Sequence, residues 1–251
     1  MTLVHQTPTL PRASFSGKVC VSVYGRTVGE LGKNVKQAQV FQPGFVELRL
    51  DYITGISDKI DQIGKIRKYP NEIYTFRSRA EGGVSRVSTT SRKGILADII
   101  STISPPLMDM EIKTLDESPE IDDLLKKNNS DINLIVSSHN FQGLESTPQL
   151  EDLVLNAARR YSPSFVKIVR TANEFQDNLT MLSLYRLAAR IAPARLISFC
   201  AGPLGLFSRI ACVSCGSPFT FASLPGKSTA SGQLDARSMT VLMESWKMGS
   251  Q

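Results

Sequence analysis

The chain alternates short apolar runs with amphipathic segments from residue 18 onward, and this alternation constrains its fold most strongly. The apolar runs are rich in β-branched and aromatic residues, so each predicts a strand. The predicted strands are Lys18–Gly25, Phe45–Tyr52, Glu72–Ser78, Pro106–Ile112, Asn133–Phe141, Phe165–Ala172, Ala194–Gly202 and Phe219–Leu224. The predicted helices are Ile56–Tyr69, Ser91–Ile103, Ser118–Asn129, Thr147–Tyr161, Asn173–Ala192 and about Asp235–Met248. Eight such units in 251 residues predict a single (β/α)8 TIM barrel, an α/β fold with eight parallel strands.

Residues 1–17 precede the first predicted strand and are polar, without acidic residues and without the apolar core of a secretory signal. We expect them to form a loose leader or a flap over the barrel floor, and residues 18–251 to form the barrel. No apolar run is long enough to cross a bilayer, so no membrane partner is expected. The cysteines at positions 20, 200, 212 and 215 are far apart or lie in apolar runs, which favours a reduced, cytoplasmic protein.

The formal net charge is +6, but the lysines and arginines do not gather into a basic tract. A nucleic-acid partner is therefore not expected, because phosphate-binding surfaces concentrate their cations. Several cations instead stand singly inside the predicted strands, an arrangement that suits a small anionic substrate.

One of these cations is Lys167, in the middle of the predicted strand Phe165–Ala172. Buried strands rarely carry a lysine, because burying an ammonium is costly unless it is paired or loses its proton. A neutral lysine is a nucleophile that can form an imine with a carbonyl substrate. Taken alone, Lys167 is more often explained by an edge strand or by a side chain that reaches solvent, so the surrounding strands must decide.

Charged and polar residues alternate with apolar residues in those surrounding strands. In Val46-Glu47-Leu48-Arg49-Leu50-Asp51 the charges share one face, and Thr75 and Arg77 share a face of the next strand. In an open sheet this face could be solvated. In a closed barrel it points inward, and the strand C-terminal ends form the mouth where active sites of such barrels lie. We therefore expect a polar barrel mouth.

Three further residues suggest chemistry at this mouth. His139 ends the strand that precedes the lysine strand and is a candidate general acid and base, although a lone histidine is more often structural. Glu81 follows Arg77 in a loop with two glycines and is a candidate to orient that histidine. Arg209 lies in the glycine-bearing turn after the strand Ala194–Gly202 and is a candidate anion-binding residue.

These motifs together resemble the type I 3-dehydroquinate dehydratases (3-dehydroquinases). The likeness covers about residues 18 to 249, and its elements appear in the order of the family. They are Glu47-Leu48-Arg49-Leu50-Asp51, Arg77 to Gly83, Asp109-Met110-Glu111, Ser138-His139-Asn140-Phe141, Phe165-Val166-Lys167-Ile168, Gly202 to Arg209 and Ala230-Ser231-Gly232-Gln233. Each piece is weak alone, but the ordered set is specific. One departure is Ser231, where the family often has proline.

The resemblance implies a TIM-barrel lyase that dehydrates 3-dehydroquinate to 3-dehydroshikimate, the third step of the shikimate pathway, which serves aromatic amino acid biosynthesis. Lys167 would form a Schiff base with the substrate ketone, His139 would move the protons, and Glu81 would orient His139. The implied substrate-binding residues are Glu47, Arg49 and Arg77 for the ring hydroxyls, and Arg209, Thr229 and Gln233 for the carboxylate. No metal or organic cofactor is implied.

Two alternatives stay open at this point. A class I aldolase acting on a sugar phosphate also uses a lysine imine, and it would need a phosphate cradle after the last two strands, where Lys227 lies. A non-catalytic anion-binding barrel would use the net positive charge without any need for Lys167. The sequence also leaves open a homodimer.

Overall fold

The computed structural model describes residues 18–66, 69–127 and 132–248. Its strands are β1 (Val19–Tyr24), β2 (Phe45–Arg49), β3 (Glu72–Thr75), β4 (Leu107–Glu111), β5 (Asn133–Asn140), β6 (Phe165–Thr171), β7 (Arg195–Ala201) and β8 (Thr220–Ser223). They form one parallel sheet in the order β7-β6-β5-β4-β3-β2-β1-β8. Phe199 of β7 and Phe221 of β8, at the two ends of this order, have ring centroids 6.1 Å apart. The sheet is therefore a nearly closed barrel, and the predicted TIM-barrel fold is confirmed.

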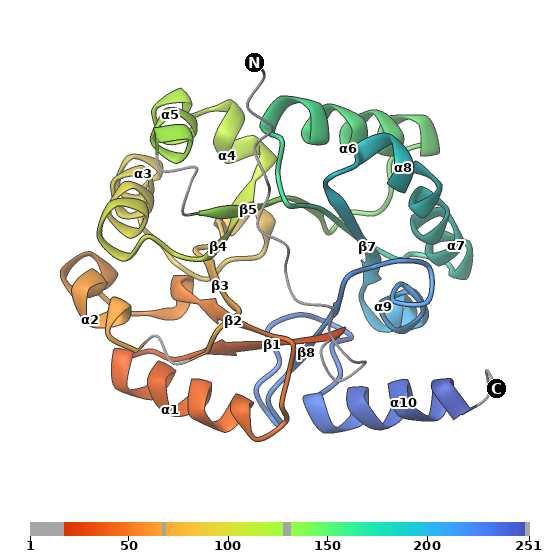
Figure 1. Ribbon diagram of the computed structural model, residues 1–251, viewed down its shortest axis with the longest axis horizontal. Coiled ribbons are helices and arrows are strands. Elements are labelled where there is room, and N and C mark those ends of the chain that lie inside the picture. Colours follow the sequence, from red (N-terminus) through yellow and green to blue (C-terminus); the bar gives the residue numbers. More distant parts are fainter. Residues whose placement is uncertain (1–17, 67–68, 128–131, 249–251) are drawn as a thin grey trace, which may run out of the picture.

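Helices surround the barrel on its outside (Figure 1). They are α1 (Val28–Gln39), α2 (Ile60–Gly64), α3 (Thr89–Asp98), α4 (Ile112–Asp116), α5 (Pro119–Lys127), α6 (Thr147–Tyr161), α7 (Phe175–Ser183), α8 (Ala188–Ile191), α9 (Leu206–Ala211) and α10 (Ala236–Met248). The start of α6 illustrates how the sequence sets these boundaries. Ser146 and Gln149 form a capping box, and Pro148 stands in the first turn, where its missing N–H costs no hydrogen bond. None of the helices in the described ranges combines the length and apolar character needed to cross a membrane.

The sequence pattern failed at some helices. It missed α1, because Gly29 and Gly32 lower its helix propensity, although Leu31, Val35 and Ala38 form the buried stripe of an amphipathic helix. It expected a helix after the glycine-bearing turn but gave it no bounds; the structure has the short α9, which contains Arg209. It also merged 173–192 into one helix, whereas the structure has α7, a 3₁₀ turn at Leu184–Leu187, and α8. The leader predicted at residues 1–17 lies outside the described residues.

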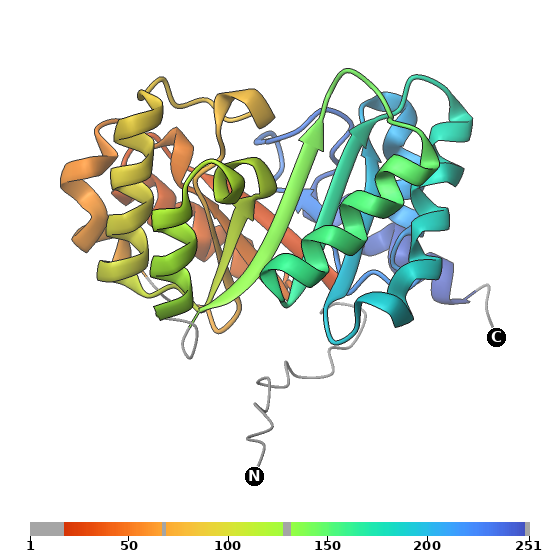
Figure 2. The ribbon, with the colours of Figure 1, turned by 90° about the horizontal axis from the view of Figure 1, so that it is seen from above.

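The barrel interior is apolar at its floor and polar at its mouth. Phe45, Phe165 and Phe219 pack together inside, with ring centroids 4.3 and 5.6 Å from Phe219. Glu47 follows Phe45 on β2 by two positions, and Lys167 follows Phe165 on β6 by two positions. Since side chains two positions apart lie on the same face of a strand, Glu47 and Lys167 also point into the barrel. Because the strands are parallel, their C-terminal ends meet at one rim, toward which the arrows point in Figure 2. The fold therefore brings the polar strand ends together above an aromatic floor.

Candidate active site

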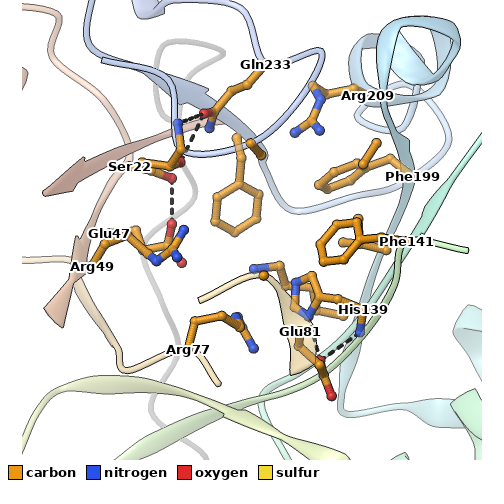
Figure 3. A pocket seen from close by; sticks show the side chains of 17 residues that line it. Ser22, Glu47, Arg49, Arg77, Glu81, His139, Phe141, Phe199, Arg209 and Gln233 are labelled. Carbon is orange, nitrogen blue, oxygen red and sulfur yellow. Dashed lines mark hydrogen bonds and ion pairs between the residues drawn. The ribbon is translucent and has the colours of Figure 1, made fainter. Parts of the chain in front are cut away.

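A pocket opens at this rim, where the C-terminal ends of the strands meet (Figure 3). Its lining includes every residue that the sequence singled out as a candidate. These are Glu47, Arg49, Arg77, Glu81, His139, Lys167, Arg209, Thr229 and Gln233. Positions that are up to 186 residues apart in the chain, from 47 to 233, are thus joined in one site by the barrel.

Lys167 lies on β6, which pairs with β5 and β7 on its two sides. Its exposure is 4%. It is therefore on an inner strand and buried, and the explanations by an edge strand or by a solvent-reaching side chain are wrong. The Nζ atom lies 3.0 Å from Oδ2 of Asp109 and 4.1 Å from the ring centroid of Phe221. The amine is thus fixed between a carboxylate and an aromatic face.

Asp109, on β4, was not among the candidates. Its Oδ1 atom accepts a hydrogen bond from Ser137 Oγ at 2.6 Å and lies 2.8 Å from Nη2 of Arg77. Burial alone would raise the pKa of Asp109, but Arg77, Lys167 and the Ser137 hydroxyl outweigh it and lower the pKa to about 2. Asp109 is therefore an ionised, fully buried link between Arg77 and Lys167.

His139 and Glu81 form a close pair. Oε2 of Glu81 lies 2.9 Å from Nδ1 of His139 and accepts the backbone N–H of His139 at 2.8 Å (Figure 3). When Glu81 is ionised it can only accept, so Nδ1 carries the proton and the proton-accepting atom of the neutral imidazole is Nε2. Burial, with the nearby cations Arg77 and Lys167, lowers the pKa of His139 well below its usual 6.5. Burial raises the pKa of Glu81 to about 7, although Arg77 opposes it.

The glycine-bearing turn delivers Glu81 to this position. The 3₁₀ turn Arg79–Glu81 ends at Gly82, whose φ is +87°. A Cβ at Gly83 would lie 2.0 Å from the carbonyl oxygen of Arg77, so only glycine allows the chain to fold back here. The turn therefore depends on its glycines and is more than an ordinary connecting loop.

The two charged side chains of β2, Glu47 and Arg49, are held in fixed orientations. Glu47 accepts hydrogen bonds from Ser22 Oγ at 2.5 Å and Thr75 Oγ1 at 2.9 Å. Arg49 makes two bonds of 2.8 Å to the carboxylate of Asp51. Such preorganised groups can hydrogen-bond a ligand without a large ordering cost.

Arg209 differs from the other cations of the pocket. Its exposure is 2%, and its guanidinium carbon lies 4.6 Å from the ring centroid of Phe199. Its Nε atom has no hydrogen-bond partner, and none of the ion pairs found among the described residues includes it. Burial without a counter-charge lowers the pKa of Arg209 to about 10. A buried cation of this kind, facing a pocket, is suited to bind an anion.

The loop 224–233 covers this side of the pocket. Oε1 of Gln233 accepts bonds from the backbone N–H and Oγ1 of Thr229 at 2.9 and 3.0 Å, which leaves the Gln233 amide nitrogen as its ligand donor. The carbonyl oxygen of Ser231 accepts the N–H of Gly202 at 3.2 Å. A proline at position 231 could accept the same bond, so the departure from the family pattern costs the loop no contact there.

The sequence reading did not assign several lining residues, namely Ser22, Phe141, Phe199 and Phe221. Ser22 lies two positions before the end of β1, as Glu47 does in β2. A polar residue at this position of a strand is a signal for a pocket residue. Phe141 was quoted only as part of the motif Ser138-His139-Asn140-Phe141, and Phe199 and Phe221 were given no role in the predicted strands. Their place at the pocket follows from the barrel geometry.

Known proteins resemble this chain in sequence and in fold. A family model described as Type I 3-dehydroquinase matches residues 19–249. A 3-dehydroquinate dehydratase of Dehalococcoides mccartyi is 33% identical over 172 residues, which cover 68% of this chain and 73% of that protein. The structure of 3-dehydroquinate dehydratase from Geobacillus kaustophilus shares the fold, with a TM-score of 0.81 at 22% identity over 93% of this chain and 92% of that one.

The type I 3-dehydroquinate dehydratase from Clostridium difficile, solved with covalently modified comenic acid, has a TM-score of 0.80 at 21% identity, with 90% of both chains covered. At these identities the two solved structures support the fold alone. The family model spans nearly the whole chain, including every lining residue of the pocket. This chain therefore belongs to the type I 3-dehydroquinase family.

Proposed function

We propose that this protein is a hydro-lyase that dehydrates 3-dehydroquinate to 3-dehydroshikimate through an imine on Lys167. The observation that carries the proposal is the joint presence, in one pocket, of a buried lysine amine, a His139–Glu81 pair and an arginine, Arg209, that has no counter-charge in the described part of the chain. These are the nucleophile, the acid and base, and the carboxylate site that the reaction needs.

The covalent step uses Lys167. After losing its proton, the amine attacks the C3 ketone of the substrate, and water leaves to give a protonated imine. The iminium withdraws electrons and so acidifies the proton on C2. Phe221, with its ring centroid 4.1 Å from Nζ, keeps water away from one side of this group.

His139 carries out the proton transfers. Nε2 removes the C2 proton, and the imidazolium then protonates the C1 hydroxyl, which departs as water while the C1–C2 double bond forms. Glu81 fixes the tautomer and stabilises the imidazolium. Hydrolysis of the imine releases the enone and restores Lys167, so one water is lost in the net reaction.

The remaining residues hold the substrate. Glu47, Arg49 and Arg77 bind ring hydroxyls from the β2 and β3 side of the mouth. Arg209 binds the carboxylate from the opposite side, with Thr229 and Gln233 from the loop above it. This division is supported by the counter-charges, because Arg49 and Arg77 are already paired with carboxylates, whereas Arg209 has no such partner among the residues that the structure describes.

Two measurements test the proposal. Adding 3-dehydroquinate should produce the absorbance of a conjugated enone. Borohydride reduction during turnover should attach the substrate mass to a peptide containing Lys167, and Lys167→Ala should abolish the label. Lys167→Arg should not restore it, because guanidinium stays charged. Labelling at another lysine would refute the assignment of Lys167.

The structure does not favour the aldolase alternative. Lys227, the cation considered for a phosphate cradle, donates to Asn34 at 3.1 Å, lies 3.6 Å from Glu30 and does not line the pocket. An anion-binding barrel without catalysis would not require the His139–Glu81 pair. Turnover of dehydroquinate compared with sugar phosphates would separate these functions.

We also propose a cytoplasmic location and no nucleic-acid partner. All four cysteines are free in the structure, which is in keeping with a reducing compartment. A homodimer remains a proposal, to be tested by light scattering on the purified chain.

A further inference from the structure

Charged side chains alternate in sign from the pocket to the helix layer. The chain of contacts runs from Lys167 through Asp109, Arg77 and Glu111 to Arg92 on α3. Consecutive members are separated by 3.0, 2.8, 3.3 and 2.5 Å. Lys167 and Arg77 line the pocket, whereas Arg92 does not. The reaction proposed above assigns no role to the outer end of this chain.

Glu111 is the branching point. Its Oε1 atom accepts the backbone N–H of Ser78 at 2.7 Å and lies 3.3 Å from Nη1 of Arg77. Ser78 begins the turn that carries Glu81, since its carbonyl oxygen accepts the N–H groups of Glu81 and Gly83 at 3.1 and 2.7 Å. One buried carboxylate therefore sets both the Arg77 guanidinium and the turn that presents Glu81 to His139.

Arg92 binds the Glu111 oxygen that does not contact Arg77. Its Nη2 atom donates to Oε2 of Glu111 at 2.5 Å and to the carbonyl oxygen of Phe76 at 2.8 Å. Its Nη1 atom donates to Thr114 Oγ1 at 2.8 Å. One planar guanidinium thus connects Phe76, just after β3, with Glu111, at the end of β4. A lysine ammonium cannot reproduce this forked arrangement of donors.

We propose that Arg92 is a positioning residue for the His139–Glu81 pair and for Arg77, acting through Glu111. The proposal rests on the proposed function. Without Arg92, Oε2 of Glu111 would keep only the hydrogen bond from Thr114 Oγ1 at 2.6 Å, and that hydroxyl would itself lose the donor that orients it. The Glu111 carboxylate could then turn toward Arg77, and the Ser78 amide would lose its fixed acceptor. The proton-transfer geometry would then loosen, while the amine of Lys167, held by Asp109, would keep its place.

The test compares Arg92→Met with Lys93→Met. Lys93 is the next residue of α3 and makes a surface ion pair with Glu120 at 3.0 Å, so its loss removes a helix cation without touching the chain of contacts. We expect R92M to lower kcat by about 10- to 100-fold, as is typical for groups that orient catalytic residues. Borohydride trapping at Lys167 should persist in R92M, and K93M should match the wild type. R92K should fall between, because it restores the charge but not the fork.

A double-mutant cycle tests the route through Glu111. R92M should cause little further loss of kcat in an E111Q background, because the group through which it acts is already changed. Additive losses of kcat in the double mutant would overturn the inference, and so would a wild-type kcat in R92M. A parallel loss of borohydride trapping and of kcat in R92M would also overturn it, because it would indicate a merely structural role. If R92M does not fold, kcat and borohydride trapping are compared between R92K and K93M instead. A wild-type chain that neither traps nor turns over dehydroquinate would instead overturn the proposed function.

Discussion

Nδ1 of His139 and the backbone N–H of the same residue share a single oxygen of Glu81, at 2.9 and 2.8 Å. This double contact fixes the imidazole both at its ring and at its backbone. Burial raises the pKa of Glu81 to about 7 and lowers that of His139 well below 6.5. The carboxylate therefore titrates in the neutral range, where the imidazole is already uncharged.

The first prediction concerns pH. Glu81 is ionised above its pKa of about 7 and neutral below it, and only the ionised form stabilises the imidazolium. We expect kcat to fall as the pH drops through about 7. In Glu81→Gln this fall should disappear, with a kcat about tenfold below the wild-type maximum. Profiles of kcat against pH for the wild type and E81Q would test this. If kcat of E81Q still falls below about pH 7, the titration belongs to another group.

The second prediction separates proton transfer from covalent binding. His139→Ala should lower kcat by roughly 10²- to 10⁴-fold, the usual contribution of a positioned acid and base. The imine should still form, because Lys167 and Asp109 are in direct contact without help from His139. Mass spectrometry after borohydride treatment, combined with steady-state rates, would test this. A nearly normal kcat would remove His139 from the proton-transfer role.

The third prediction concerns the stability that Asp109 supplies. Asp109→Asn leaves two buried cations without their shared carboxylate, so the free energy of unfolding at pH 7 should fall by about 3 kcal/mol. The pKa of Asp109 is lowered from 3.8 to about 2, so its contribution is present above about pH 4 and is lost as the pH falls toward 2. Urea titrations at several pH values should therefore show the gap between wild type and D109N narrowing in acid. A gap that is constant down to pH 3 would contradict this assignment.

The fourth prediction concerns the loop 224–233. Gly226 and Gly232 both have φ of +70°, but a Cβ at Gly232 would lie 2.1 Å from the carbonyl oxygen of Gly202, whereas Gly226 has nothing within 4 Å. Gly232→Ala should push the loop off the β7 turn and raise KM by about tenfold, since the loop completes the carboxylate site. Gly226→Ala, which shares only the backbone strain, is the matched control.

The loop should also be protected by a bound substrate analogue. Hydrogen exchange across residues 224–233 should slow in its presence in the wild type and in G226A, and less in G232A. Ser231→Pro should tighten substrate binding by restricting the open loop, provided the backbone at position 231 accepts proline. Equal exchange with and without the analogue would show that the loop does not close over the site.

Much of the fold followed from the sequence because parallel barrel strands are short, apolar and separated by amphipathic helices. Where local propensity opposed tertiary packing, as at the two glycines of α1, the prediction failed. Charged residues inside strands, such as Glu47 and Lys167, were recognisable because a charge in a buried strand is unusual.

Asp109 shows the limit of this reasoning. In the sequence it was only one residue of the motif Asp109-Met110-Glu111, because its role depends on contact with Lys167, 58 residues away and two strands along the sheet. That contact follows from the stagger of β4, β5 and β6, in which Asp109 pairs with Ile135 and Ser137 pairs with Lys167. Register of this kind is set by the closing of the barrel, and no local pattern encodes it.

The buried charge of Arg209 leaves the interior of the folded protein without charge balance. Within the described part of the chain, Arg49, Arg77 and Lys167 each have an acidic partner, but Arg209 has none. Folding alone therefore leaves a buried positive charge uncancelled, which disfavours the native state. A bound carboxylate cancels it, so ligand occupancy and resistance to unfolding are linked through a single charge. Carboxylate-bearing analogues should accordingly raise the melting temperature more than neutral analogues of the same size, because only they complete the charge balance of the folded protein.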